Sequence, residues 1–357
     1  KINVSYAGPL VPEQVQVIED MIQDSDSLGW QTLNLKDAEQ KGFLKEAPLE
    51  DMYIRHIEKS FDLKAIKDAK LILAYDAMYG AGQRVMKRLF PDMPKLHCDH
   101  NPGFNGQAPE PIHKNLIEFS NFIKAQGNIS CGLATDGDAD RLGLYDNKGN
   151  FVDSHHIILL LIHYLVKYKK QSGKVVVAFS TTVKIRNICK HYGLPLEVVK
   201  IGFKYICSIM VKEDVLVGGE ESGGIAIKGH IPERDGIWIG LTIWEFMAKT
   251  GKSLNELIEE VYAITGTFCF ERNDLHISEE IKAKVLQNCK SGSYTEFGNY
   301  KVSRVEDLDG FKFFFDDNTW MMIRASGTEP VLRVYAEAAD RKTAEDILAS
   351  AKKVLLA

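Results

Sequence analysis

Short apolar runs alternate with helical patterns between about residue 62 and residue 265, and this alternation limits the fold more than any other feature. The apolar runs lie at Leu71–Tyr75, Lys174–Phe179, Leu196–Val199 and Val215–Gly219. Strands that alternate with helices are typical of largely parallel sheets covered on both faces. We therefore predict two α/β domains with parallel or mixed sheets, over residues 61–152 and 153–265.

The pattern changes after residue 265. Four strand-like runs follow with short polar connections, at Thr267–Glu271, Lys312–Phe315, Trp320–Ile323 and Leu332–Ala338. Helical patterns at Ser278–Gln287 and Arg341–Leu355 stand apart from them. Strands that follow one another directly favour an antiparallel sheet. Residues 266–357 are therefore predicted to form a small α+β domain.

Composition narrows the class of protein. The 357 residues are 45% hydrophobic and 26% charged, which is ordinary for a soluble globular protein. The net charge of −5 includes no basic block, so a nucleic-acid partner is not expected. No apolar run is long enough to span a membrane. The six cysteines are scattered and form no Cys-x-x-Cys pair, which favours a reducing, cytoplasmic location.

An acidic loop lies between two apolar runs at Ala134–Leu142. It carries three carboxylates at alternate positions, Asp136, Asp138 and Asp140. Carboxylates this close repel one another unless a cation lies among them. Gly137 allows the backbone to curl so that alternate side chains converge. Hard oxygen ligands favour Mg²⁺ or Ca²⁺.

The details of the loop exclude one kind of metal site and suggest another. An EF-hand loop needs Gly at its sixth position and Glu at its twelfth, where this chain has Arg141 and Asn147. The alternative is a solvated acidic turn without a metal. Arg141 favours the metal site, because a cation beside the carboxylates lets the loop hold a metal and a phosphate together.

A glycine-rich loop, Gly218–Gly224, follows the run Val215–Gly219. Its glycines allow a sharp bend and a close approach to a ligand. Glu220 and Ser222 then offer an acceptor and a donor, which suits sugar hydroxyls. It is not a Walker loop, since no Gly-Lys-Ser/Thr follows. The alternative is a tight turn with solvated acids.

A third loop, Arg324–Pro330, lies between two strands of the predicted α+β domain. Arg324 offers a guanidinium fork for phosphate oxygens. Ser326 and Thr328 supply hydroxyls, and Gly327 permits a nest of backbone N–H groups. The loop is a candidate phosphate site, and its alternative is an ordinary polar connection.

Single basic residues give weaker signals. Lys204 lies in Gly202–Tyr205, and Arg234 precedes Asp235-Gly236. Lone basic residues are more often solvated surface residues than ligands. His155 and His156 adjoin the start of an apolar helix, where capping or packing is the simpler interpretation.

Together these loops resemble the α-D-phosphohexomutases, a family that includes phosphoglucomutase, phosphomannomutase and phosphoglucosamine mutase. Thr135–Arg141, Gly219–Gly224 and Arg324–Pro330 occur in the order and context of that family. The resemblance implies three related α/β domains and a smaller α+β domain around one cleft. It also implies that a phosphoserine exchanges its phosphoryl group with a hexose phosphate through a hexose bisphosphate, between C1 and C6.

The resemblance assigns roles to residues of this chain. Asp136, Asp138 and Asp140 would hold Mg²⁺ against the phosphoserine, with Arg141 beside it. Glu220 and Ser222 would bind sugar hydroxyls. Lys204 and Arg234 would be further cations of the cleft. The non-reacting phosphate would be held by Arg324, Ser326, Gly327 and Thr328.

The chain departs from the family in its first domain. The family's nucleophile lies in a Ser-His-Asn-Pro loop, and no such segment occurs here, since Asp99 precedes His100-Asn101-Pro102. We therefore expect residues 1–60 to be a remnant of the first domain. A chain without that nucleophile is expected to bind a sugar phosphate weakly and not to turn it over.

Three other interpretations remain open. Gly224 stands where several members of the resembling family carry His, which weakens a claim to mannose or glucosamine substrates, and phosphopentomutase-like enzymes stay open as an alternative. A non-catalytic sugar-phosphate-binding protein would need the sugar and phosphate loops but no serine. A Mg²⁺-dependent phosphatase could use Asp136 and Asp138, but it leaves the other loops unexplained.

Overall fold

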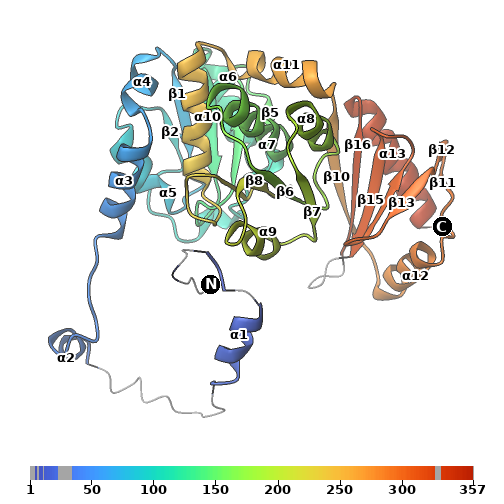
Figure 1. Cartoon of the computed structure of the whole chain (residues 1–357), viewed down its shortest axis with the longest axis horizontal. Helices are drawn as coiled ribbons and strands as arrows, with labels where there is room; N and C mark the ends of the chain where they lie inside the picture. The colour runs from blue at the N-terminus through green and yellow to red at the C-terminus, as the bar shows by residue number, and fades with distance from the viewer. Residues whose placement is uncertain (1–4, 6–7, 11, 23–33, 326–330, 357) are drawn as a thin grey trace.

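A computed structural model describes residues 5, 8–10, 12–22, 34–325 and 331–356. Within them, two mixed sheets with helices precede an antiparallel sheet at the C-terminal end of the chain (Figure 1). This arrangement confirms the predicted fold class. In this part of the chain, no helix is both long enough and apolar enough to cross a membrane.

The first sheet has the strand order β2-β1-β3-β4-β5. Its strands are β1 (Leu73–Asp76), β2 (Lys95–Leu96), β3 (Cys131–Thr135), β4 (Leu142–Tyr145) and β5 (Phe151–Val152). β1 runs parallel to β2 and β3, whereas β3–β4 and β4–β5 are antiparallel. The β3–β4 pair carries the acidic loop at its turn. The helical elements of this region are α3 (Leu49–Ser60), α4 (Leu63–Asp68), α5 (Gly82–Leu89), η2 (Phe104–Gly106), η3 (His113–Asn115) and α6 (Ile117–Gln126).

The second sheet has the order β7-β6-β8-β9. Its strands are β6 (Lys174–Ala178), β7 (Leu196–Val199), β8 (Val215–Gly219) and β9 (Ile225–Ile227). β6 runs parallel to β7 and β8, and β9 returns antiparallel after the glycine-rich loop. Each sheet therefore contains an antiparallel hairpin, β3–β4 in the first and β8–β9 in the second, whose turn is one of the predicted site loops. The helices are α7 (Ser154–His163), the π-helix η4 (Tyr164–Tyr168), α8 (Lys184–Tyr192), α9 (Phe203–Met210), α10 (Gly236–Thr250) and α11 (Leu254–Thr265).

The C-terminal domain contains a five-stranded antiparallel sheet in the order β10-β16-β15-β14-β13. Its strands are β10 (Cys269–His276), β13 (Arg304–Glu306), β14 (Phe311–Phe314), β15 (Trp320–Ala325) and β16 (Val331–Ala338), with a separate pair β11 (Glu296–Phe297) and β12 (Tyr300–Lys301). Helices α12 (Glu279–Lys290) and α13 (Arg341–Leu355) complete the domain. One face of the sheet packs with these helices around Phe313, Ile323 and Val334.

Residues before α3 contribute little to the packed body. The short helices α1 (Pro12–Glu19) and α2 (Leu35–Gln40) stand apart from the sheets in Figure 1. Exposed apolar side chains on them and beside them include Met21 and Ile22.

A single large hydrophobic cluster joins the first and second sheets. It includes Leu133 of β3, Val175 of β6 and Trp244 of α10. Helix α10 is buried along nearly its whole length, which agrees with its apolar sequence on every face. The acidic loop and the glycine-rich loop thus project from a continuous body.

Candidate functional site

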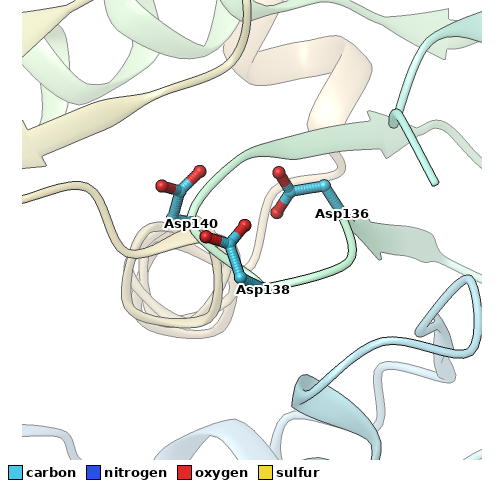
Figure 2. Close-up of side chains that lie close together, drawn as sticks. All are labelled: Asp136, Asp138 and Asp140. Atoms are coloured by element: carbon cyan, nitrogen blue, oxygen red, sulfur yellow. The ribbon is translucent and has the colours of Figure 1, made fainter. Parts of the chain in front are cut away.

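The acidic loop begins at the end of β3 and returns into β4. Asp136 and Asp140 are buried, whereas Asp138 is exposed. Ala139 has a φ of +61°, so the turn uses a left-handed backbone at a residue with a side chain. One oxygen of each carboxylate lies within 4.8 Å of the others, and Figure 2 shows all three on the same loop. This oxygen-only set fits a hard divalent cation.

Arg141 offsets the negative charge of Asp136, the most buried of these carboxylates. Its Nε lies 2.7 Å from Asp136 Oδ2, and its backbone N–H donates to Oδ1 at 3.0 Å. Burial raises the pKa of Asp136, and the contacts with Arg141 oppose that rise. The loop therefore already holds one positive charge beside its carboxylates.

Arg234 connects the acidic loop to the glycine-rich loop. Its Nη2 lies 2.6 Å from Asp140 Oδ2, and its Nη1 lies 4.0 Å from Glu220 Oε2. Glu220 also accepts a hydrogen bond of 2.9 Å from the backbone N–H of Gly202. Burial raises the pKa of Glu220, and Arg234 partly offsets the effect. The arginine thus lies between two predicted site loops.

Backbone contacts hold the same two loops in register. The N–H of Leu142 donates to Gly223 O at 3.2 Å, and Arg141 forms a β-bridge with Gly224. Gly223 has a φ of +92°, and a Cβ there would lie 2.6 Å from Leu142 O. The close approach therefore depends on glycine at this position.

Lys204 and Ser222 are exposed residues beside this centre. Lys204 lies in the first turn of α9, two residues after the Gly202 amide that binds Glu220. Its Nζ lies 5.2 Å from the ring centroid of Tyr205. Ser222 lies two residues after Glu220 in the glycine-rich loop.

Arg324 comes from the C-terminal domain, at the end of β15. Its Nε lies 3.5 Å from Asp309 Oδ1. The residues predicted to complete the phosphate loop, Ser326, Gly327 and Thr328, lie outside the described residues.

Two further residues tie the C-terminal domain to the site, and the sequence analysis singled out neither. Arg272 of β10 lies 3.5 Å from Glu221 Oε1, in the glycine-rich loop. Asp309 accepts a hydrogen bond of 2.8 Å from the backbone N–H of Ile201. The available signal was the Asp309-Gly310 pair, which is typical of a turn. Its partner Ile201 is not apparent from local sequence.

The chain matches three domain models of one family, described as phosphoglucomutase/phosphomannomutase. They cover alpha/beta/alpha domain II over residues 51–149, alpha/beta/alpha domain III over 153–264 and the C-terminal domain over 276–354. The chain therefore belongs to the α-D-phosphohexomutase family.

Individual relatives are phosphosugar mutases. A phosphoglucomutase/phosphomannomutase of Thermococcus kodakarensis is 28% identical over 318 residues, covering 88% of this chain and 67% of the relative. A phosphoglucosamine mutase of Methanococcus vannielii is 29% identical over 348 residues, covering 94% and 73%. The crystal structure of a putative phosphomannomutase from Thermus thermophilus aligns with a TM-score of 0.80 and 29% identity, over 99% of this chain and 74% of that one.

Proposed function

We propose that this chain supplies the metal, sugar and distal phosphate sites of a phosphosugar mutase. The reaction would move a phosphoryl group between C1 and C6 of a hexose phosphate through a phosphoserine and a bisphosphate intermediate. The observation that carries the proposal is the position of Arg234 between Asp140 of the acidic loop and Glu220 of the glycine-rich loop. The printed sequence has no Ser-His-Asn-Pro segment, so the proposal assigns no nucleophile within it.

The acidic loop is proposed to hold Mg²⁺ through Asp136, Asp138 and Asp140. Mg²⁺ would supply positive charge beside the transferring phosphoryl group, the main requirement of this chemistry. Arg141 and Arg234 already contact two of the three carboxylates. We propose that Arg141 and Lys204 add further positive charge at the reacting phosphate.

The glycine-rich loop is proposed to bind the sugar. Glu220 accepts hydrogen bonds from hydroxyl groups, and the exposed Ser222 can donate and accept. Burial raises the pKa of Glu220, and the neighbouring Arg234 cation opposes that rise. Arg324, with Ser326, Gly327 and Thr328, is proposed to hold the phosphate that does not react.

Titration calorimetry tests this assignment without requiring turnover. Glucose 6-phosphate and glucose 1,6-bisphosphate would be titrated into the protein with and without Mg²⁺. We expect binding by the wild type and at least a tenfold loss in Glu220→Ala, since a buried acceptor for hydroxyls is removed. Glu296→Ala, an exposed change of the same type, is the control. No binding of either ligand by the wild type, or equal affinity in Glu220→Ala, would contradict the proposal.

A further inference from the structure

The turn at Asp309-Gly310 packs directly against Arg324. It connects β13 to β14, and Gly310 has a φ of +96°. A Cβ at Gly310 would lie 2.7 Å from Ile323 O and 3.2 Å from Arg324 Cβ. Only glycine allows this approach, which brings the turn that carries Asp309 against Arg324.

The two carboxylate oxygens of Asp309 face different partners. Oδ1 lies 3.5 Å from Arg324 Nε within the C-terminal domain. Oδ2 accepts a hydrogen bond of 2.8 Å from the Ile201 N–H, in the loop that leads into α9. The next residue, Gly202, donates its N–H to Glu220. A single side chain therefore lies between the proposed phosphate arginine and the segment that holds the proposed sugar acceptor.

An arginine side chain has many rotamers, and ordering it costs free energy when a ligand binds. A carboxylate at Nε restricts the guanidinium before the ligand arrives. It leaves the Nη groups as the donors best placed for phosphate oxygens. The second contact, to Ile201, ties the C-terminal domain to the segment whose Gly202 N–H donates to Glu220.

We infer that Asp309 is a positioning residue that sets the spacing between the phosphate site at Arg324 and the sugar site at Glu220. The inference rests on the proposed function for the identity of the ligand. Asp309 does not contact the ligand; it acts through Arg324 and through Ile201.

The C-terminal domain has other contacts that keep variants of Asp309 folded and docked. Phe314, Trp320 and Tyr335 pack with Phe179 and Val183 in one apolar cluster. Because this cluster does not involve Asp309, a change in ligand affinity can be separated from loss of the domain interface.

The test compares Asp309→Ala and Asp309→Asn with the wild type, by glucose 6-phosphate titration and by hydrogen exchange of the Ile201 amide. Asp309→Ala removes both contacts, so we expect about tenfold weaker binding and faster exchange at Ile201. Asp309→Asn has a single carbonyl oxygen, which can keep the shorter bond to Ile201 but not the ion pair. We expect it to weaken binding about threefold with the amide still protected. Asp307→Asn, an exposed change of the same charge, is the control and should match the wild type.

A second background isolates the role of Arg324. Arg324→Met keeps much of the side-chain length but removes every N–H donor and the charge, so adding Asp309→Asn to it should change the remaining affinity no further. Wild-type affinity in Asp309→Ala, or an undiminished effect of Asp309→Asn in the Arg324→Met background, would overturn the inference. The proposed function fails in a different way, by absence of glucose 6-phosphate binding to the wild type. In that case unchanged Ile201 exchange in Asp309→Ala would still overturn the inference by itself.

Discussion

The first and second sheets are joined differently from the second sheet and the C-terminal domain. One hydrophobic cluster runs through the first two, whereas the C-terminal domain has a separate core on the helical face of its sheet. Its other face meets the second-sheet region through a smaller apolar cluster around Phe179 and Trp320. The acidic and glycine-rich loops thus project from one continuous core, while the position of Arg324 depends on how the C-terminal domain docks.

The chemical nature of the two junctions also differs. The contact between the second-sheet region and the C-terminal domain is called the second junction below. It buries ionisable groups, including Lys312 of β14, Glu337 of β16 and Lys184 of α8. Lys312 donates to the carbonyl oxygen of Phe179, and Lys184 donates to Asn318 Oδ1. Burial lowers the pKa of Lys312 and raises that of Glu337. Buried charges contribute little net stability compared with apolar packing, so this junction is expected to separate more easily.

The largest effect is expected in the shared core. Trp244 of α10 is fully buried, and Trp244→Ala removes its packing and leaves a cavity. We expect a loss of about 3–5 kcal/mol in the free energy of unfolding, measured by urea denaturation. Hydrogen exchange should accelerate in both β3 and β6, with little change in β16. Faster exchange in only one of these two sheets would contradict the claim that the first and second sheets share one core.

A smaller loss is expected where α10 crosses the first sheet. A Cβ at Gly240 would lie 2.4 Å from Leu133 Cδ2 of β3. Helix propensity alone would make Gly240→Ala stabilising by about 1 kcal/mol. Because the added methyl overpacks the contact, we expect instead a destabilisation of about 1–3 kcal/mol. A stabilised variant in urea denaturation would show that α10 and β3 are not closely packed.

The second junction should respond to pH through His155. The buried ring of His155 lies against Phe270, with centroids 4.0 Å apart, and burial lowers its pKa to about 4. Below about pH 6.5 the unfolded chain takes up a proton that the folded protein does not, so stability falls until about pH 4. Between about pH 7.5 and 5.5 this group alone should cost about 1.4 kcal/mol. His155→Gln should lose that part of the pH dependence in urea denaturation, and an unchanged profile would refute the assignment.

The smallest effect concerns the ion pair between Arg272 and Glu221. Arg272 is exposed and Glu221 is half-buried, and their nearest charged atoms lie 3.5 Å apart. A double-mutant cycle with Arg272→Ala and Glu221→Ala should give a coupling of about 0.5 kcal/mol in stability. A coupling above about 2 kcal/mol would mean that this pair, and not the apolar cluster, holds the C-terminal domain in place.

Local sequence could mark the acidic and glycine-rich loops as candidate sites because each is a contiguous segment with unusual composition. Asp136–Asp140 and Gly218–Gly224 lie at turns between strands, as the apolar runs on either side indicated. The sequence analysis did not predict α9 or α11. For α11 a signal was present, since Ser253 and Glu256 form a capping box. Helix α9 is short and follows a glycine, so its pattern is weak.

Long-range pairs explain what local sequence could not provide. Arg234 pairs with Asp140, and Ile201 pairs with Asp309, across different sheets. Such contacts depend on how the sheets pack, and no local periodicity encodes them. The contacts of Asp309 and Arg272 with the glycine-rich loop region are therefore visible only in the three-dimensional arrangement.

The central claim is that a sugar-phosphate site is shared between the two-sheet body and the C-terminal domain. Hydrogen exchange with and without glucose 1,6-bisphosphate and Mg²⁺ tests it most directly. The account predicts slower exchange on ligand addition in three segments, residues 134–142, residues 218–224 and β15. Protection confined to one body, or absent from all three segments at saturating ligand, would contradict it.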